Sequence, residues 1–293
     1  MRLRDIPPRL VIAIQQRRCV PFIGSGFSKQ ADANHFPNWN QLLERMIRIA
    51  EAKCHISKSE ARSLDALLKK NRHLMAAESL KSKLPRDLYY SILEEQFDPP
   101  NVRPSRVHNL LLELNPQLII TTNYDRLIED SYAHAARKAM TVVPYSDAAA
   151  LQRRLQEANI RNRPFLFKIH GSIEDTASII LTENDYRRLM YDERGYTTVL
   201  SSIFIHFVVL MLGFSFNDEE LILFLGQIRH ALKGSANPDY IMLPKKEVSD
   251  TEIERFRNDF GLEVITYSSS NKHEEVTSFL SQLVKCYREQ NNG

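Results

Sequence analysis

The chain has 293 residues, of which 43% are hydrophobic and 26% are charged, so it can bury a sizeable globular core. Its 39 basic and 36 acidic residues leave a net charge of only +3, which does not demand a nucleic-acid or membrane partner. The three cysteines, Cys19, Cys54 and Cys286, lie far apart and include no CxxC pair. This argues against a four-cysteine zinc site and fits a reducing compartment.

No segment has the pattern of a signal peptide or a membrane span. The stretch from Met1 to Asp5 is charged and lacks an apolar core. The longest apolar run, from Ile203 to Phe216, contains His206 and is too short to cross a bilayer. We therefore expect a soluble, cytoplasmic protein.

The first third of the chain is predicted to be mainly helical. A short helix over Arg9–Arg17 follows two prolines, and Cys19–Ile23 is predicted to be a short buried strand that leads into a glycine-containing turn, Gly24–Ser28. From Trp39 to about Leu114, apolar residues recur at helical spacing without a convincing strand. We interpret this stretch as an insertion.

The rest of the chain alternates strands with helices. The six further predicted strands are Leu118–Thr122, Thr141–Tyr145, Phe165–Ile169, Phe207–Leu212, Tyr240–Leu243 and Glu263–Tyr267. The predicted helices are Arg126–Lys138, Ala148–Ala158, Glu219–Leu232 with Asp218 as its cap, Thr251–Phe260 and His273–Arg288. Strands that are apolar on both faces and alternate with helices predict an α/β fold, a parallel sheet covered by helices on both faces. We expect one domain over residues 1–293, with a core at about 1–37 and 115–293 and a helical insertion at about 38–114.

Four of the predicted strands end in polar or glycine-containing segments. These segments are Gly24-Ser-Gly-Phe-Ser28, Thr121-Thr-Asn-Tyr-Asp125, His170-Gly171 and Gly213-Phe-Ser215. Ligands of open α/β sheets bind at the carboxyl ends of strands, so the four segments indicate a binding site.

Each segment also has a structural interpretation. Glycines 24 and 26 would let backbone N–H groups approach a phosphate, but Lys29 stands where the dinucleotide fingerprint has its third glycine. Asn123 or Asp125 could cap the following helix, and His170 could be a satisfied residue at the rim of the core. The turn at Gly213–Ser215 could be only a tight connection between a strand and a helix.

In this order, the four segments resemble the pattern of the sirtuin family: a GAG-x-S turn, a TQN-x-D cluster, an HG pair and a G-[ST]-S turn. Three positions differ, with Ser25 for alanine, Thr122 for glutamine and Phe214 for serine or threonine. The resemblance spans roughly residues 15–270. It implies a Rossmann-like NAD-binding fold, with Asn123 near the nicotinamide ribose and His170 as the general base.

Two departures indicate which branch of the family the chain resembles. Sirtuin deacylases carry a four-cysteine zinc module between the HG pair and the last glycine turn, whereas this chain has no cysteine between His170 and Gly213. The segment His35–Leu43, with the pattern P-x-W-x-x-L-L, replaces the family's PDFR element. It is similar to bacterial sirtuin-like domains of anti-phage defence systems, which hydrolyse NAD. Trp39 is then either an anchor for the insertion or a ligand contact.

The resemblance therefore implies a metal-free NAD glycohydrolase that releases nicotinamide and ADP-ribose. Asn123 would orient the attacking water or a ribose hydroxyl, and His170 would accept a proton. The expected NAD contacts are Gly24, Ser25, Gly26, Ser28, Thr122, Asp125, Gly213 and Ser215. Alternative functions are a sensor that binds NAD or ADP-ribose without turnover, and a zinc-free protein deacylase. Lys29 and the lack of a visible second substrate domain argue against a dehydrogenase.

The resemblance also suggests how the activity is controlled. A free NADase would harm its host, so we expect a homo-oligomer whose activity depends on assembly or on a partner. Similar proteins are encoded beside a HerA-type ATPase, and an Argonaute-type protein is the alternative partner. We expect no direct contact with nucleic acid.

Overall fold

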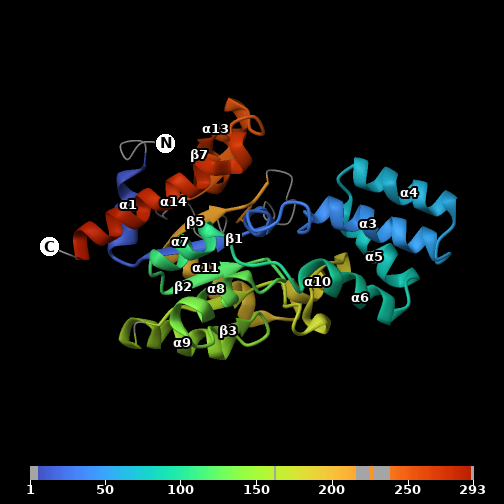
Figure 1. Ribbon diagram of the computed structural model, residues 1–293, viewed down its shortest axis with the longest axis horizontal. Coiled ribbons are helices and arrows are strands. Elements are labelled where there is room, and N and C mark those ends of the chain that lie inside the picture. Colours follow the sequence, from blue (N-terminus) through green and yellow to red (C-terminus); the bar gives the residue numbers. More distant parts are fainter. Residues whose placement is uncertain (1–5, 162, 216–224, 227–237, 292–293) are drawn as a thin grey trace.

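The computed structural model describes residues 6–161, 163–215, 225–226 and 238–291. Its centre is a seven-stranded sheet in the order β3–β4–β2–β1–β5–β6–β7, and every pair of neighbours is parallel (Figure 1). The strands are β1 (Cys19–Ile23), β2 (Leu118–Thr121), β3 (Thr141–Pro144), β4 (Phe165–Lys168), β5 (Val208–Leu212), β6 (Asp239–Pro244) and β7 (Leu262–Tyr267). The predicted α/β, Rossmann-like class and all seven predicted strands are confirmed.

The order of the strands explains where a ligand can bind. From β1 the chain forms β2 beside it, then β3 at the edge of the sheet and β4 between β2 and β3, and returns to β5 on the other side of β1. The crevice at such a reversal is the usual ligand site of an open parallel sheet. Ile23 pairs with both Thr121 and Leu212, and Thr121 pairs with Lys168. The last residues of β4, β2, β1 and β5 therefore lie side by side, and the four motif segments follow directly after them.

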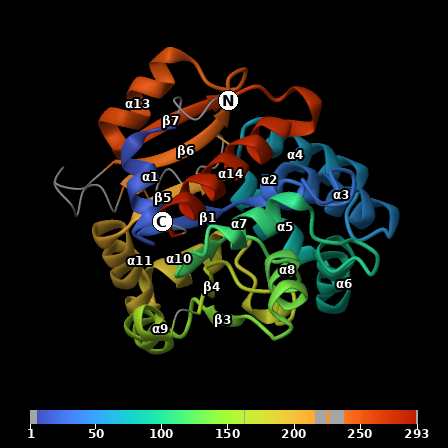
Figure 2. The same ribbon diagram turned by 60° about the vertical axis from the view of Figure 1, so that its left-hand side comes forward.

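Helices cover both faces of the sheet because alternate strand residues point to opposite sides. In β1, Cys19 and Ile23 belong to one hydrophobic cluster, whereas Val20 and Phe22 belong to the other. The first face carries α1 (Pro8–Gln15), α7 (Arg106–Glu113), α8 (Leu127–Ala136) and α14 (Ser270–Asn291), as Figure 2 shows for α1, α7 and α14. The second carries α9 (Ala148–Arg161), α10 (Glu183–Tyr191), α11 (Arg194–His206) and α13 (Asp250–Phe260).

Four consecutive helices form a body at one end of the molecule (Figure 1), which we call the four-helix unit. They are α3 (Trp39–Ala52), α4 (Lys58–Lys69), α5 (His73–Lys83) and α6 (Arg86–Phe97). Asn38 and Ser57 start α3 and α4 through capping boxes with Gln41 and Glu60. The hydrophobic cluster of this unit also takes in Tyr124, so the unit packs directly beside the site. Helix α7, although within 38–114, packs against α14 on the sheet.

Some local structure differs from the sequence-based prediction. The segment predicted as a turn at Gly24–Ser28 contains one helical turn, α2 (Ser25–Ser28). Helices α10 and α11 were given no range from the sequence, and the apolar residues of α11 merge into the run that leads to β5. The predicted helix Glu219–Leu232 and its cap Asp218 lie outside the described residues, apart from 225–226.

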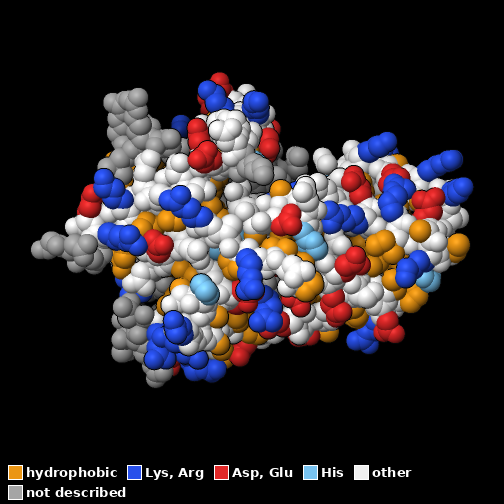
Figure 3. Space-filling view, in the orientation of Figure 1, with side chains coloured by type: hydrophobic (Ala, Val, Ile, Leu, Met, Phe, Trp, Pro, Cys, Tyr) orange, Lys and Arg blue, Asp and Glu red, His pale blue; other side chains and the backbone are white. Residues whose placement is uncertain are grey.

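The surface agrees with the near-neutral charge balance. On the face shown in Figure 3, basic and acidic side chains are interspersed without one large area of a single sign. Within the part of the chain that the structure describes, no helix is both long and apolar enough to cross a membrane.

Candidate functional site

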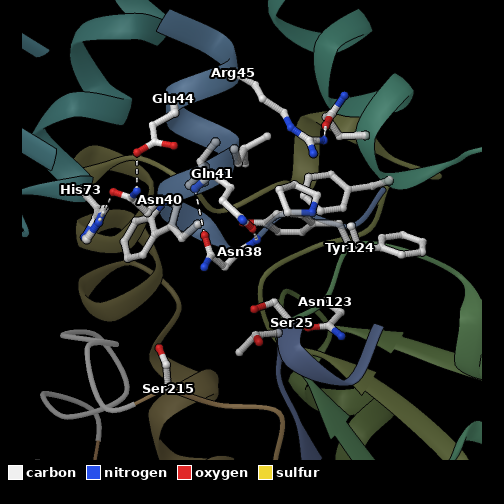
Figure 4. Close-up of a pocket in the computed structure, with 18 of the residues that line it drawn as sticks. Ser25, Asn38, Asn40, Gln41, Glu44, Arg45, His73, Asn123, Tyr124 and Ser215 are labelled. Atoms are coloured by element: carbon white, nitrogen blue, oxygen red, sulfur yellow. Dashed lines mark hydrogen bonds between the residues drawn. The ribbon is translucent and has the colours of Figure 1, made fainter. Parts of the chain in front are cut away.

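A pocket of about 1500 Å³ opens at the carboxyl ends of the central strands. Six predicted site residues line its wall on the sheet side: Ser25, Ser28, Thr122, Asn123, Asp125 and His170. Gly213 and Ser215 line it as well. The opposite wall is formed by the four-helix unit, and Figure 4 shows residues of α3 across the cavity from Ser25 and Asn123.

A second hollow of about 690 Å³ lies beyond Gly213, over the ends of β6 and β7. Gly26 lines this hollow, and Ser25, Gly213 and Ser215 line both cavities. Gly24 is buried and lines neither of them. The two glycine turns thus stand between two adjoining cavities, which together could take an elongated ligand.

Asn123 is held in one orientation by the glycine turn. Its side-chain Nδ2 donates to the Gly24 carbonyl oxygen at 3.0 Å and to Ser28 Oγ at 2.8 Å. Its backbone N–H donates to Thr121 Oγ1 at 3.0 Å. Among the described residues, Asn123 Oδ1 is buried and has no hydrogen-bond partner. Because an unsatisfied buried acceptor is costly, this oxygen is suited to accept a hydrogen bond from a bound water or ligand hydroxyl.

Asp125 connects the site to the helix that follows it. Its Oδ2 accepts a hydrogen bond from Ser28 Oγ at 2.6 Å, and its Oδ1 accepts from the Leu127 N–H at 3.1 Å. Burial raises the pKa of Asp125, while Ser28 and Lys168 oppose that rise. Asp125 thus accepts a hydrogen bond from the first N–H of α8, although Arg126 occupies the N-cap position, whereas the side chain of Asn123 bonds to the glycine turn instead.

His170 follows β4 at the edge of the same pocket. Burial lowers the pKa of its imidazole to about 3, so the ring is neutral at physiological pH and can accept a proton or hydrogen bond. The next residue, Gly171, has φ +88°, and a Cβ there would lie 2.3 Å from the Ser178 carbonyl oxygen. Glycine is required at 171 for the chain to turn sharply after the histidine.

Gly213 brings the first and last motif segments into contact. It has φ +78°, and a Cβ there would lie 2.5 Å from the Phe27 backbone nitrogen. Its carbonyl oxygen accepts a hydrogen bond from the Gly26 N–H at 2.8 Å. The close approach of the two turns places Ser25 and Ser215, both exposed, at the mouth of the cavity.

Trp39 is the first residue of α3 and lines the pocket. Its indole stacks on His73 with ring centroids 5.3 Å apart and an angle of 27° between the planes. His73 in turn contacts Asn40 Oδ1 at 3.2 Å. Trp39 therefore joins α3 to α5 and also faces the cavity, so the structure is compatible with both sequence-based interpretations.

Comparison with known proteins identifies the family. The model of the SIR2-like domain family matches residues 117–265, which is half of the chain. This chain belongs to the SIR2-like domain family. The matched region contains Asn123, His170 and Gly213, whereas the first glycine turn and the four-helix unit precede it.

Individual relatives of this SIR2-like chain come from bacteria. It is 27% identical over 222 residues to "NAD(+) hydrolase ThsA" of Enterococcus faecium, covering 69% of this chain and 44% of that protein. It is 25% identical over 187 residues to the protein of the same name from Bacillus cereus (strain MSX-D12), covering 60% and 38%. It is 22% identical over 286 residues to "Defense-associated sirtuin 2" of Bacillus subtilis, covering 94% and 26%. The chain thus spans less than half the length of each of these relatives.

Two side chains at the site of this SIR2-like chain were not found from its sequence. Lys168, at the end of β4, is 1% exposed, and its Nζ lies 2.7 Å from Glu129 Oε1. The same Nζ donates to the carbonyl oxygens of Tyr124 at 3.2 Å and Asp125 at 2.6 Å. Tyr186, on α10, places its hydroxyl beside His170. A lysine at the end of an apolar strand was the sequence feature that could have indicated Lys168. Nothing in the local sequence indicates Tyr186.

The described residues also bear on metal binding. Among them, no group of three or more His, Cys, Asp and Glu side chains is arranged to hold a metal ion.

Proposed function

We propose that this chain is an NAD glycohydrolase that cleaves NAD to nicotinamide and ADP-ribose as part of bacterial anti-phage defence. The observation that carries this proposal is the buried Oδ1 of Asn123, which has no hydrogen-bond partner among the described residues and lies in the same pocket as the neutral imidazole of His170. The two glycine turns beside them adjoin a second cavity. Membership of the SIR2-like family and the names of the relatives support NAD as the substrate.

The two cavities suit the two halves of NAD. The nicotinamide ribose would lie in the larger pocket, where Asn123 Oδ1 accepts a hydrogen bond from a ribose hydroxyl or from the attacking water. The pyrophosphate would pass the turns at Ser25 and Gly213, and the adenosine ribose would lie toward the second hollow. Asp125 is expected to act mainly by fixing Ser28 and thereby Asn123, because both of its oxygens are already bonded.

The chemistry requires one base and no acid. When the bond between ribose C1′ and the pyridinium nitrogen breaks, the electron pair goes to that nitrogen, so nicotinamide leaves as a neutral molecule without a proton. A water molecule then bonds to the cation-like C1′, and its proton passes to His170. The balance is NAD and water giving ADP-ribose, nicotinamide and one proton. The imidazole of His170 is unprotonated before the reaction, and because its lowered pKa makes it a weak base, it passes the proton on to solvent.

The experiment is to incubate the purified chain with NAD and to quantify nicotinamide and ADP-ribose by chromatography. Asn123→Ala and His170→Ala are expected to lower the rate by at least a hundredfold, the usual scale for a lost catalytic base. Matched controls are Asn101→Ala and His134→Ala, which replace exposed residues of the same types. Full activity in either site variant would refute the site assignment.

Two further measurements distinguish the alternative functions. Tight NAD binding by calorimetry without nicotinamide release would indicate a sensor. Acyl transfer from an acyl-lysine peptide to ADP-ribose would indicate a deacylase.

We further propose that assembly controls the activity, because an ungated NADase would deplete the host's own NAD. A homo-oligomer bound to a HerA-type ATPase is the arrangement we favour, with an Argonaute-type protein as the second candidate. Light scattering of the chain alone and with each partner, alongside the NAD assay, tests this. A monomer with full activity in isolation would contradict it.

A further inference from the structure

The hydroxyl of Tyr186 lies against the imidazole of His170. Its oxygen is 3.1 Å from Nδ1 and 3.3 Å from Nε2. The two rings meet edge to face, with centroids 5.1 Å apart and an angle of 83° between their planes. A hydroxyl at these distances from both nitrogens would clash with Cε1 if it lay in the ring plane, so it lies over the ring, between the two nitrogens. It is therefore within reach of either nitrogen.

The position of this hydroxyl affects what His170 can do. A neutral imidazole carries a proton on one nitrogen and a lone pair on the other, and only the second can act as a base. A tyrosine hydroxyl can donate to the bare nitrogen or accept from the N–H, and either bond is in line only when the ring turns that nitrogen toward the hydroxyl. The contact therefore favours one tautomer together with one ring rotation. The nitrogen that Tyr186 does not engage is then left for the substrate.

Helix α10, which carries Tyr186, is fixed to the four-helix unit through its first turn. Lys81 Nζ, on α5, contacts both carboxylate oxygens of Asp185 at 2.8 and 2.9 Å. Asp185 also forms a capping box with Thr182. The Asn184 N–H donates to Glu78 Oε2, again on α5, at 3.0 Å. A movement of α5 would therefore move the residue next to Tyr186.

We propose that Tyr186 is a positioning residue that holds His170 in one tautomer and ring orientation, and that the Lys81–Asp185 ion pair links this contact to the four-helix unit. The inference rests on the proposed role of His170 in NAD cleavage. Tyr186 does not need to touch the reacting atoms. Tyr186 affects the reaction by orienting His170, and α5 affects it by fixing the position of Tyr186.

Two readouts on the full chain test the proposal, and one of them does not require turnover. In histidine side-chain ¹⁵N NMR spectra, with His170 assigned from His170→Gln, the wild type is expected to show one dominant tautomer. Tyr186→Phe, which keeps the ring, is expected to show a mixture of tautomers. In the NAD assay its kcat is expected to fall about five- to tenfold, the rate equivalent of one lost hydrogen bond, with little change in KM.

Tyr191→Phe is the matched control, since Tyr191 ends the same helix and is 77% exposed. It is expected to match the wild type in both readouts. Lys81→Met is expected to reproduce part of the change at His170 without altering a residue that lines the pocket.

An unchanged His170 spectrum in Tyr186→Phe would overturn the positioning role, whether or not the protein cleaves NAD. If the wild type cleaves NAD and Tyr186→Phe has the same kcat, the contact between Tyr186 and His170 does not contribute to catalysis. An unchanged spectrum in Lys81→Met would overturn the link to the four-helix unit. If the wild type never cleaves NAD, the proposed function fails, and the NMR comparison still decides the tautomer.

Discussion

Replacing Lys168 with methionine would test the support beneath the candidate site. The lysine is 1% exposed and pairs with Glu129 at 2.7 Å, while its hydrogen bonds hold the carbonyl groups of Tyr124 and Asp125. It also donates to Ser172 Oγ at 3.2 Å. One side chain thus ties the segment after Asn123 to the segment after His170. Lys168→Met removes all of these contacts and leaves a buried carboxylate without its cation.

Removing one partner of a buried ion pair lowers the free energy of unfolding by about 3–5 kcal/mol. For a chain of this size, each kcal/mol lowers Tm by roughly 2–4 °C. Burial already raises the pKa of Glu129 despite the opposing charge of Lys168, so removing that charge raises the pKa further. A carboxyl whose folded pKa exceeds its unfolded value near 4.3 stabilises the fold less as pH rises. The stability that the variant loses relative to the wild type should therefore grow as pH rises above the pKa of Glu129 in the wild type, by at most about 1.4 kcal/mol per pH unit.

The assay is urea unfolding of wild type and variant at a series of pH values. Lys138→Met, at an exposed position, is the control and is expected to stay within about 0.5 kcal/mol of the wild type. The double variant Lys168→Met/Glu129→Leu should recover roughly half or more of the loss, because the Glu129 carboxylate is no longer left buried without its cation. A loss below about 1 kcal/mol, or one that is independent of pH, would refute this account of the ion pair.

Three further predictions concern the site itself. Gly213→Ala should destabilise the fold by about 1–3 kcal/mol, because residue 213 has φ +78° and the new Cβ would lie 2.5 Å from the Phe27 nitrogen. It should also weaken NAD binding measured by calorimetry. Unaltered binding would contradict the close contact of the two turns. Ser28→Ala removes the donor to the buried carboxylate of Asp125 and should lower the free energy of unfolding in urea by about 1–3 kcal/mol. It should also lower the NADase activity. Wild-type stability would contradict the role of this hydrogen bond. Because burial lowers the pKa of His170 to about 3, the neutral base persists on acidification, and the NADase rate should not show a midpoint near 6.5; such a midpoint would show that the ring is solvated.

Much of the fold could be predicted from the sequence because its strands are apolar on both faces. Each predicted strand agrees with the structure to within about two residues, since only a sheet covered on both sides needs such runs. Helix α11 was missed because its apolar residues continue into β5 with only His206 between them. A sequence pattern alone does not mark where the period changes from helix to strand.

The sequence by itself determined which segments could form a site, since Asn123, His170 and the glycine turns all follow apolar strands. Only the tertiary structure decided that β4, β2, β1 and β5 are neighbours, which places these segments side by side. It also decided that Lys168 is buried against Glu129 and that Tyr186 meets His170. Local periodicity specifies whether a segment is a strand or a helix, but contacts between distant segments depend on the order in which strands pair and on how helices pack over them.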